Sequence, residues 1–286
     1  MNLNRFRVRP GEKVDLRRYN PADTGPFKSR ERAIEQLQAG LKRLVALQER
    51  LYAEDRWAVL LIFQAMDAAG KDSAVKHVMS GLNPQGTQVF SFKRPSDEEL
   101  DHDYLWRSVK ALPERGRIGI FNRSYYEEVL VVRVHPEILG SQKLPASLVT
   151  RDIWKERYED INAFERYLSR NGTLIRKFFL HVSKEEQRRR LLARLDEPSK
   201  NWKFTIADLE ERDRWADYMR AYEQALSKTS TKHAPWFVVP ADHKWFTRLA
   251  VAELFVEALE SLDLKFPKLS KEQLAALAKA RKRLEA

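Results

Sequence analysis

Apolar residues at spacings of three and four predict a helix over residues 30–54. Leucines recur at positions 37, 41, 44, 47 and 51, which places them on one face of such a helix. The next segment, WAVLLIFQAM at residues 57–66, is continuously apolar, as is typical of a strand buried on both faces of a parallel sheet. It ends in a turn, DAAGKD, that leads into another helical pattern.

Further strands and helices alternate along the rest of the chain. We expect strands at residues 87–92, 117–121, 173–182 and 236–239. Helical patterns lie between and after them, at residues 98–112, 148–170, 185–195, 208–226 and 246–262. This alternation is typical of βαβ units, and it predicts a parallel sheet in a three-layer α/β/α domain.

The chain contains no internal repeat and no low-complexity linker. We therefore expect one core over residues 56–265, with a helical lid at about 185–217. An N-terminal arm and helix occupy residues 1–55, and the first 27 residues, which are polar and contain three prolines, are expected to be extended. A basic amphipathic helix is expected over residues 266–286.

The charge balance points to an anionic partner. Lys and Arg number 52 against 41 Asp and Glu, a net charge of +11 over 286 residues. Nucleic acid, an acidic membrane surface and a phosphate-rich substrate all fit such an excess. Because cysteine is absent, disulfides, thiolate zinc sites and a cysteine nucleophile are excluded. No apolar run approaches a membrane span, and the N-terminus does not read as a signal peptide, so we expect a cytoplasmic protein without membrane contact.

The turn after the first predicted strand is a candidate phosphate-binding loop. Residues 65–71 read A-x-x-x-x-G-K, whereas the strict motif is G-x-x-x-x-G-K-[ST]. Ala65 replaces the first glycine, and Asp72 replaces the hydroxyl residue that binds Mg²⁺. Asp67 is the nearest oxygen donor that could replace this hydroxyl. The alternative is an ordinary strand-to-helix turn with a surface lysine, Lys71, but the position after a buried strand favours a phosphate site.

A second candidate site follows the predicted strand at residues 117–121. Asn122 and Arg123 come directly after it, at the edge of an open parallel sheet where ligands bind. Asn122 is a neutral metal ligand, Glu127 could add charge from the following helix, and the planar fork of Arg123 suits phosphate. The alternative is a simple helix start, capped by Ser124.

Taken together, five segments resemble the family-2 polyphosphate kinases. In chain order they are QAMDAAGKDSAVKHVMSGLNPQG, SFKRPSDEELDHDYLWR, FNRSYYEEVLVVRVHPE, FFLHVSKEEQRRRLLARLDEPSKNWKF and TSTKHAPWFVVPADHKWFTR. The resemblance implies a P-loop kinase fold similar to thymidylate kinase. It also implies transfer of a terminal phosphoryl group between inorganic polyphosphate and adenine or guanine nucleotides, with Mg²⁺ or, in its place, Mn²⁺. A homo-oligomer, a dimer or a tetramer, is implied as well.

The resemblance also implies roles for individual residues. Catalytic roles fall to Asp67, Lys71, Arg123 and Glu127, and metal ligation to Asp67, Asn122 and Glu127. Phosphate or nucleotide contacts are expected at Ala68, Ala69, Gly70, Asp72, Ser73, Asn83, Arg190 and Arg194, and polyphosphate contacts at Lys76, Lys93, Arg94 and Lys203.

The same resemblance indicates which nucleotides are accepted as phosphoryl acceptors, and it raises the question of which residue contacts the nucleobase. Most family members carry Asp where this chain has Asn122. Asn122 together with Glu127 resembles the subgroup that phosphorylates both AMP and ADP. His102 is expected to be structural, and the tryptophans are expected mostly in the core, with one of them, or a Phe or Tyr, as a candidate to stack on adenine.

For the basic residues, a purely structural or surface role stays open as the alternative to phosphate binding. The lid arginines could belong to a solvated helix whose charges pair with each other, and Lys93 and Arg94 could be ordinary surface residues. Two other functions also stay open, an ATP-dependent nucleotide or nucleoside kinase and a basic nucleic-acid-binding protein with a vestigial P-loop. The last is disfavoured because the chain lacks interleaved aromatic and basic motifs, so we expect no specific nucleic-acid binding.

Overall fold

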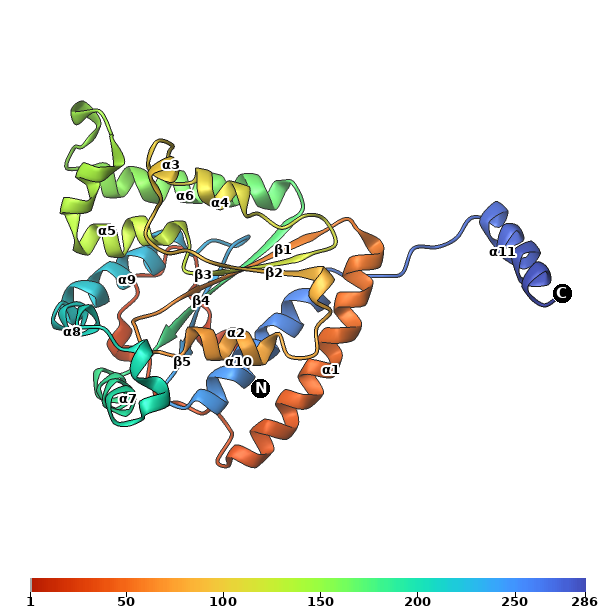
Figure 1. The fold of residues 1–286 in the computed structure, drawn as a ribbon, viewed down its shortest axis with the longest axis horizontal. Coiled ribbons are helices and arrows are strands. Elements are labelled where there is room, and N and C mark those ends of the chain that lie inside the picture. The colour runs from red at the N-terminus through yellow and green to blue at the C-terminus, as the bar shows by residue number, and fades with distance from the viewer. Residues whose placement is uncertain (1) are drawn as a thin grey trace.

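Five parallel strands form the centre of the molecule. The computed structural model describes residues 2–286. Its sheet has the order β2-β3-β1-β4-β5 (Figure 1), in which β1 (Ala58–Gln64) is the middle strand and all seven of its residues are buried. The other strands are β2 (Thr87–Ser91), β3 (Ile118–Asn122), β4 (Thr173–His181) and β5 (Trp236–Pro240). The expected parallel α/β architecture is therefore confirmed, and the continuous apolar run of β1 is explained by its burial on both faces.

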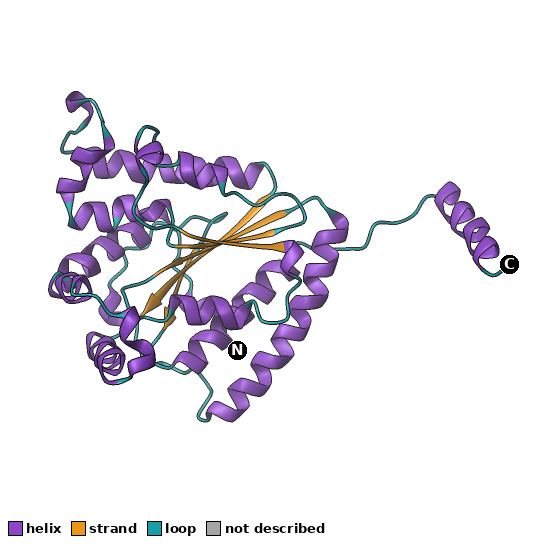
Figure 2. Ribbon diagram, in the orientation of Figure 1, coloured by secondary structure: helices purple, strands orange, loops and turns teal. Residues whose placement is uncertain are grey.

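Helices cover both faces of this sheet and complete the three layers (Figures 1 and 2). On one face lie α1 (Arg30–Glu54), α2 (Lys71–Val78) and α10 (Lys244–Glu260). The other face carries α6 (Ile153–Arg170) and α9 (Trp215–Thr229), with the short helices α3 (Asp97–Leu100), α4 (Trp106–Lys110) and α5 (Val131–Val134). No helix within residues 2–286 is both long enough and apolar enough to cross a bilayer.

The predicted lid lies beyond the carboxyl ends of the strands (Figure 1). It consists of α7 (Lys184–Asp196), a 3₁₀ helix (Pro198–Lys203) and α8 (Ala207–Asp213). The basic C-terminal helix is α11 (Lys271–Leu284); it stands clear of the body, and none of its residues is buried. By contrast, the N-terminal arm packs on the core, because Phe6, Val8 and Leu16 are buried there.

Several helix boundaries differ from those expected. The helix expected at residues 98–112 is two short ones, because the Asp103 side chain accepts a hydrogen bond from the Leu105 N–H (2.9 Å) and forms a turn. The helix expected from residue 148 starts at Ile153, and that expected at 208–226 is divided at Arg214 into α8 and α9. Trp202 is 78% exposed, so it is not a core residue.

A buried ionic network fixes the segment that follows β3. Lys177 on β4 is fully buried, and its ammonium group donates to Glu165 Oε2 (2.6 Å), the Tyr126 hydroxyl (2.8 Å) and the Thr229 carbonyl (2.7 Å). The Tyr125 hydroxyl also donates to Glu165 (2.9 Å). Burial lowers the pKa of Lys177 to about 8. Since every member has partners, the network orders the turn at Tyr125 and Tyr126 that leads to Glu127.

A buried histidine makes the fold sensitive to acid. His181, the last residue of β4, is buried, and this burial lowers its pKa to about 4. The unfolded chain takes up this proton near pH 6.5, so between pH 6.5 and 4 the unfolded state binds more protons. Stability therefore falls as the pH is lowered through this interval.

We expect His181→Gln to remove part of this acid sensitivity. The wild type should lose up to about 3 kcal/mol through His181 on going from pH 6.5 to 4, since one pKa unit corresponds to about 1.4 kcal/mol. Urea unfolding of both proteins at pH 7.5, 6 and 5 measures the slope. The same slope in both proteins would contradict this role of His181.

Candidate active site

Parallel pairing of β1 with β3 brings the two candidate strand ends together. Phe63 of β1 pairs with Asn122 of β3, and the Arg123 N–H donates to the Phe63 carbonyl (3.1 Å). Arg123 has a left-handed backbone, with φ of 64°, a conformation that is uncommon outside glycine. It turns the chain sharply at the sheet edge and keeps the Arg123 side chain beside the turn that follows β1.

That turn has the shape of an anion-binding loop. Gly70 (φ 104°) and Ala68 (φ 59°) have positive φ values, and the turn leads directly into the N-terminus of α2 at Lys71. Ala65, where the strict motif has glycine, has no positive φ, so its side chain causes no backbone strain. The Lys71 ammonium group donates to the Ala65 carbonyl (2.6 Å), across the turn. Burial lowers the pKa of Lys71, although the charge of Asp67 opposes this effect.

Charged groups of opposite sign lie close together at the carboxyl ends of β1 and β3. Arg123 Nη2 lies 3.2 Å from Asp67 Oδ1. Both side chains are partly exposed, at 42% and 33%, and therefore accessible to a ligand. Burial raises the pKa of Glu127, while the charges of Arg123 and Lys71 lower it. The four residues predicted as catalytic are thus brought to one site, with two acidic and two basic groups.

Asn122 has a structural partner at this site. Its amide nitrogen donates to Asp72 Oδ1 (2.6 Å), and the Ser91 hydroxyl lies 3.4 Å away. An aspartate at this position would place two carboxylates side by side, which is unfavourable. The neutral amide at position 122 is therefore compatible with the acidic residue at position 72.

The lid is joined to the phosphate-binding turn through Arg190. Its Nη1 donates to the carbonyls of Ala68 (3.1 Å) and Ala69 (2.7 Å), and its Nη2 to those of Ala241 (2.6 Å) and Asp242 (3.0 Å). Its Nε donates to Glu186 (2.7 Å). The guanidinium group thus holds the turn in place through backbone carbonyls, instead of pointing free into the site as a phosphate ligand would.

Other residues of α7 and the lid have similar internal roles. The Gln187 amide nitrogen donates to the Asp67 carbonyl (3.0 Å), a contact that sequence reasoning missed, although Gln187 lies three positions before Arg190. Arg194 donates to the Lys203 carbonyl (2.9 Å) and lies 3.4 Å from Asp208 Oδ2. The Arg194 side chain therefore stabilises the lid itself, and Lys203 is exposed.

The remaining predicted residues lie farther from the turn. Lys76 is exposed on α2, and Lys93 and Arg94 are exposed beyond the end of β2. Ser73 accepts a hydrogen bond from Arg248 (2.7 Å), a second contact that the sequence did not reveal. Asn83 precedes β2, at the amino-terminal ends of the strands and so on the side of the sheet away from the site. There its backbone N–H and carbonyl form hydrogen bonds with the Gln48 side chain. The structure does not bring Asn83 to this site.

The oxygen donors at the site are few. Within residues 2–286, no group of three or more His, Cys, Asp or Glu side chains is placed to hold a metal by itself. Mg²⁺ in phosphate-transferring sites is commonly bound by one or two carboxylates and by the phosphates of the substrate. Asp67 and Glu127 are compatible with that kind of shared coordination.

Comparison with known proteins identifies the family. Residues 27–267 match the model of the family described as polyphosphate kinase 2. The chain belongs to the polyphosphate kinase 2 family. It is 55% identical to the ADP-polyphosphate phosphotransferase of Rhodopseudomonas palustris, with 99% of each chain covered. It is 46% identical to the AMP/ADP-polyphosphate phosphotransferase of Meiothermus ruber, over 93% of this chain and 96% of that one.

A solved structure agrees with this assignment. The crystal structure of polyphosphate kinase 2 from Arthrobacter aurescens superposes with a TM-score of 0.87 at 43% identity, covering 97% of this chain and 95% of the other. The predicted P-loop kinase fold and the resemblance to this family are therefore confirmed, and the chain is a polyphosphate kinase.

We expect Arg190→Ala to lower both the stability and the activity of this kinase. The change removes hydrogen bonds to four backbone carbonyls, so the free energy of unfolding should fall by about 2–4 kcal/mol. Arg189→Ala is the matched control, because the Arg189 side chain is 68% exposed. Thermal and urea unfolding measure the difference. If Arg190→Ala lost activity but kept the stability of the control, Arg190 would act on phosphate directly.

Proposed function

We propose that this kinase transfers the terminal phosphoryl group of inorganic polyphosphate to AMP and to ADP, with Mg²⁺ as cofactor. The observation that carries the proposal is the Asp67–Arg123 pair (3.2 Å) beside Lys71, at the joined ends of β1 and β3. A dimeric or tetrameric assembly and a cytoplasmic location stay predictions from the sequence.

In this mechanism the residues position phosphate and stabilise charge. The backbone N–H groups of the turn and the Lys71 ammonium group hold the phosphates being exchanged. An oxygen of the acceptor phosphate attacks the terminal phosphorus of polyphosphate, a new P–O bond forms, and the P–O bond to the shortened chain breaks. Arg123 stabilises the charge that spreads over the transferring group. No covalent enzyme intermediate is required.

Asp67 has to be freed from Arg123 for this reaction. Arg123 Nη2 and Asp67 Oδ1 form an ion pair (3.2 Å), so an incoming phosphate would compete with Asp67 for the guanidinium group. Asp67 and Glu127 would then hold Mg²⁺ jointly with phosphate oxygens. The cation supplies further neutralisation of phosphate charge. Without it, two carboxylates beside a polyanion would repel the substrate.

The surface charge suits a polyanionic substrate. The chain carries a net charge of +11, and the side chains of Lys76 on α2 and of Lys93 and Arg94 beyond β2 are exposed. Binding of a polyanion releases counterions, as it does for nucleic acids. The affinity for polyphosphate should accordingly fall as salt is added.

The reaction is tested by incubating the enzyme with AMP or ADP, polyphosphate and Mg²⁺, with ATP omitted, and resolving the products by chromatography. We expect ADP and ATP to form, and EDTA to stop the reaction. Lys71→Ala should lower kcat by roughly 100-fold or more, since it removes a charge at the transferring phosphate. Lys42→Ala, at an exposed lysine of α1, is the control. Transfer that requires ATP as donor would contradict the proposal.

Glu127 is expected to set the acceptor range. AMP is shorter than ADP by one phosphoryl group, and a carboxylate at Glu127 could hold the cation or its water in the space left by that group. Glu127→Gln should therefore lower kcat/KM for AMP more than kcat/KM for ADP. The two losses should differ by a factor of roughly ten or more. The exposed Glu137→Gln (side chain 69% exposed) is the control. Equal losses with both acceptors would assign Glu127 to the metal in general.

A further inference from the structure

A cavity of about 200 Å³ lies between the N-terminal arm and the carboxyl ends of β4 and β5. The arm contributes Arg5 and residues 18–20 to its lining, and the last residues of the two strands, His181 and Pro240, line it as well. None of the lining residues belongs to the candidate active site. Because β1, β4 and β5 are parallel, the cavity lies on the same side of the sheet as the phosphate-binding turn, as a separate hollow.

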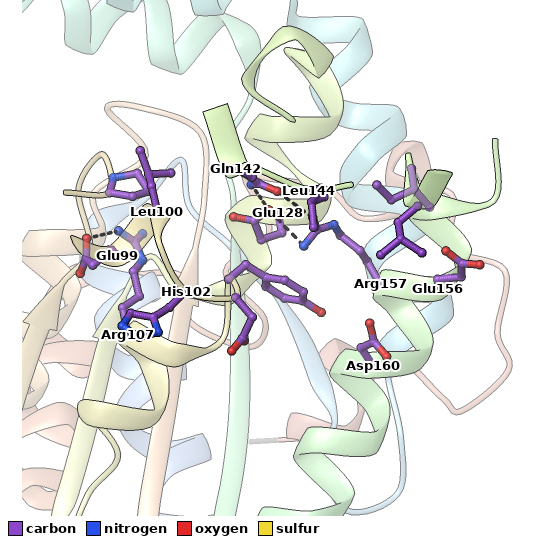
Figure 3. A pocket seen from close by; sticks show the side chains of 15 residues that line it. Glu99, Leu100, His102, Arg107, Glu128, Gln142, Leu144, Glu156, Arg157 and Asp160 are labelled. Atoms are coloured by element: carbon purple, nitrogen blue, oxygen red, sulfur yellow. Dashed lines mark hydrogen bonds and ion pairs between the residues drawn. The ribbon is translucent and has the colours of Figure 1, made fainter. Parts of the chain in front are cut away.

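The charge of its lining distinguishes this cavity from the one in Figure 3. The cavity in Figure 3 lies beside α6 and has a volume of about 260 Å³. Its acidic lining residues include Glu99, Glu128, Glu156 and Asp160. The charged side chains of the cavity at the arm are Arg5, Arg18 and a single carboxylate, Asp23. Acidic groups repel an anion, whereas two guanidinium groups attract one.

The one carboxylate of this cavity already has partners. Asp23 Oδ1 accepts a hydrogen bond from the Gly25 N–H (2.8 Å), and its Oδ2 is paired with Arg5. By contrast, the Arg18 side chain is 83% exposed, and its Nε lies 3.9 Å from Asp15 Oδ2. An ion pair of that length at the surface contributes little. The Arg18 guanidinium group is therefore available to an anion that enters the cavity.

A buried ring nitrogen in the lining has no hydrogen-bond partner. His181 lines the cavity and is only 7% exposed. The backbone of Leu16 and Tyr19 lies near its ring, yet its Nδ1 atom makes no hydrogen bond. Burial lowers the pKa of His181 to about 4, so at neutral pH the ring carries one N–H donor and one acceptor nitrogen. Because buried polar atoms in folded proteins are nearly always paired, this nitrogen points to a ligand.

We propose that the cavity at the N-terminal arm binds a phosphoryl anion, with Arg5 and Arg18 as its charged contacts and the His181 ring as a hydrogen-bonding partner. Free orthophosphate and a segment of a polyphosphate chain share this chemistry. Phosphate oxygens accept hydrogen bonds from the planar guanidinium fork and from an imidazole N–H. Binding at this cavity goes beyond the proposed transfer reaction and does not require it.

Backbone hydrogen bonds connect this cavity to the phosphate-binding turn. The Ala241 N–H donates to the His181 carbonyl (2.9 Å). The Asp242 N–H donates to the carbonyl of Pro21 in the arm (3.0 Å). Arg190 binds the carbonyls of Ala241 and Asp242 and also two carbonyls of the turn. An anion that holds the arm in place would therefore also stabilise the segment through which Arg190 holds the turn.

Two matched variants test the proposal. Arg18→Gln and Arg17→Gln remove the same charge from neighbouring positions, but the exposed Arg17 does not line the cavity. The readout is the ring resonance of His181 in NMR spectra of the histidine-labelled enzyme at pH 7.5, assigned by its loss in His181→Gln. Orthophosphate, tripolyphosphate and long-chain polyphosphate are titrated separately at constant ionic strength, with chloride as the reference anion.

In the wild type and in Arg17→Gln, the His181 resonance should shift saturably with at least one of these phosphoryl anions. Arg18→Gln should raise the dissociation constant roughly tenfold, because a charge-assisted hydrogen bond is lost. A shift with orthophosphate would show that a single free phosphate fills the cavity, and a shift with the chains alone would assign it to polyphosphate. A shift that is unchanged in Arg18→Gln would come from phosphate at the turn, and an equal shift with chloride would be a salt effect. Either of these results, or no shift at all, would overturn the proposal.

Discussion

The parallel pairing of β1 with β3 is the constraint on which the site depends. Because both strands run in the same direction and are in register at Phe63 and Asn122, the segments that follow them leave the sheet at the same edge. The turn with Asp67 and Lys71 comes from one strand, and Arg123 comes from the other. A shift of two residues in this register would move Arg123 by about 7 Å along the strand, too far for its contact with Asp67.

Contacts outside the strands then hold this edge in a defined shape. Arg190 binds two carbonyls of the turn and two at the end of β5, so the lid, the turn and the sheet are joined through one side chain. On the other side, the buried Lys177 orders the tyrosines that precede Glu127. The position of each charged group therefore depends on residues that never meet the substrate, which suits catalysis by positioning.

The architecture could be predicted from the sequence because the residues of β1 and of the elements next to it show the hydrophobic patterns of their own secondary structure. The apolar run of β1, the glycine turn and the leucines of α1 each carry their own signal, and the strands are where they were expected. The breaks in the helices after β2 and at Arg214 were not predictable, since single side-chain contacts such as that of Asp103 cause them.

The site could be predicted only in part, because several of its residues make contacts with segments that are distant in the sequence. The residues next to strand ends, Asp67, Lys71 and Arg123, could be grouped from topology alone. Arg190 was predicted as a phosphate contact, whereas in the structure it donates to backbone carbonyls. These carbonyls belong to segments more than 50 positions away, and no sequence pattern reveals them. Asn83 was expected at the site because it belongs to the first of the five resembling segments, whereas α2 carries the chain back to the amino-terminal ends of the strands.

The central claim is that the two strand ends form one site, and a double-mutant cycle on turnover tests it most directly. Lys71→Met and Arg123→Met are measured singly and together, as kcat/KM with polyphosphate and ADP. If both cations act on the same transferring phosphate, the double variant should lose much less than the product of the single losses. Losses that multiply fully would show that Lys71 and Arg123 act independently, and would contradict the account.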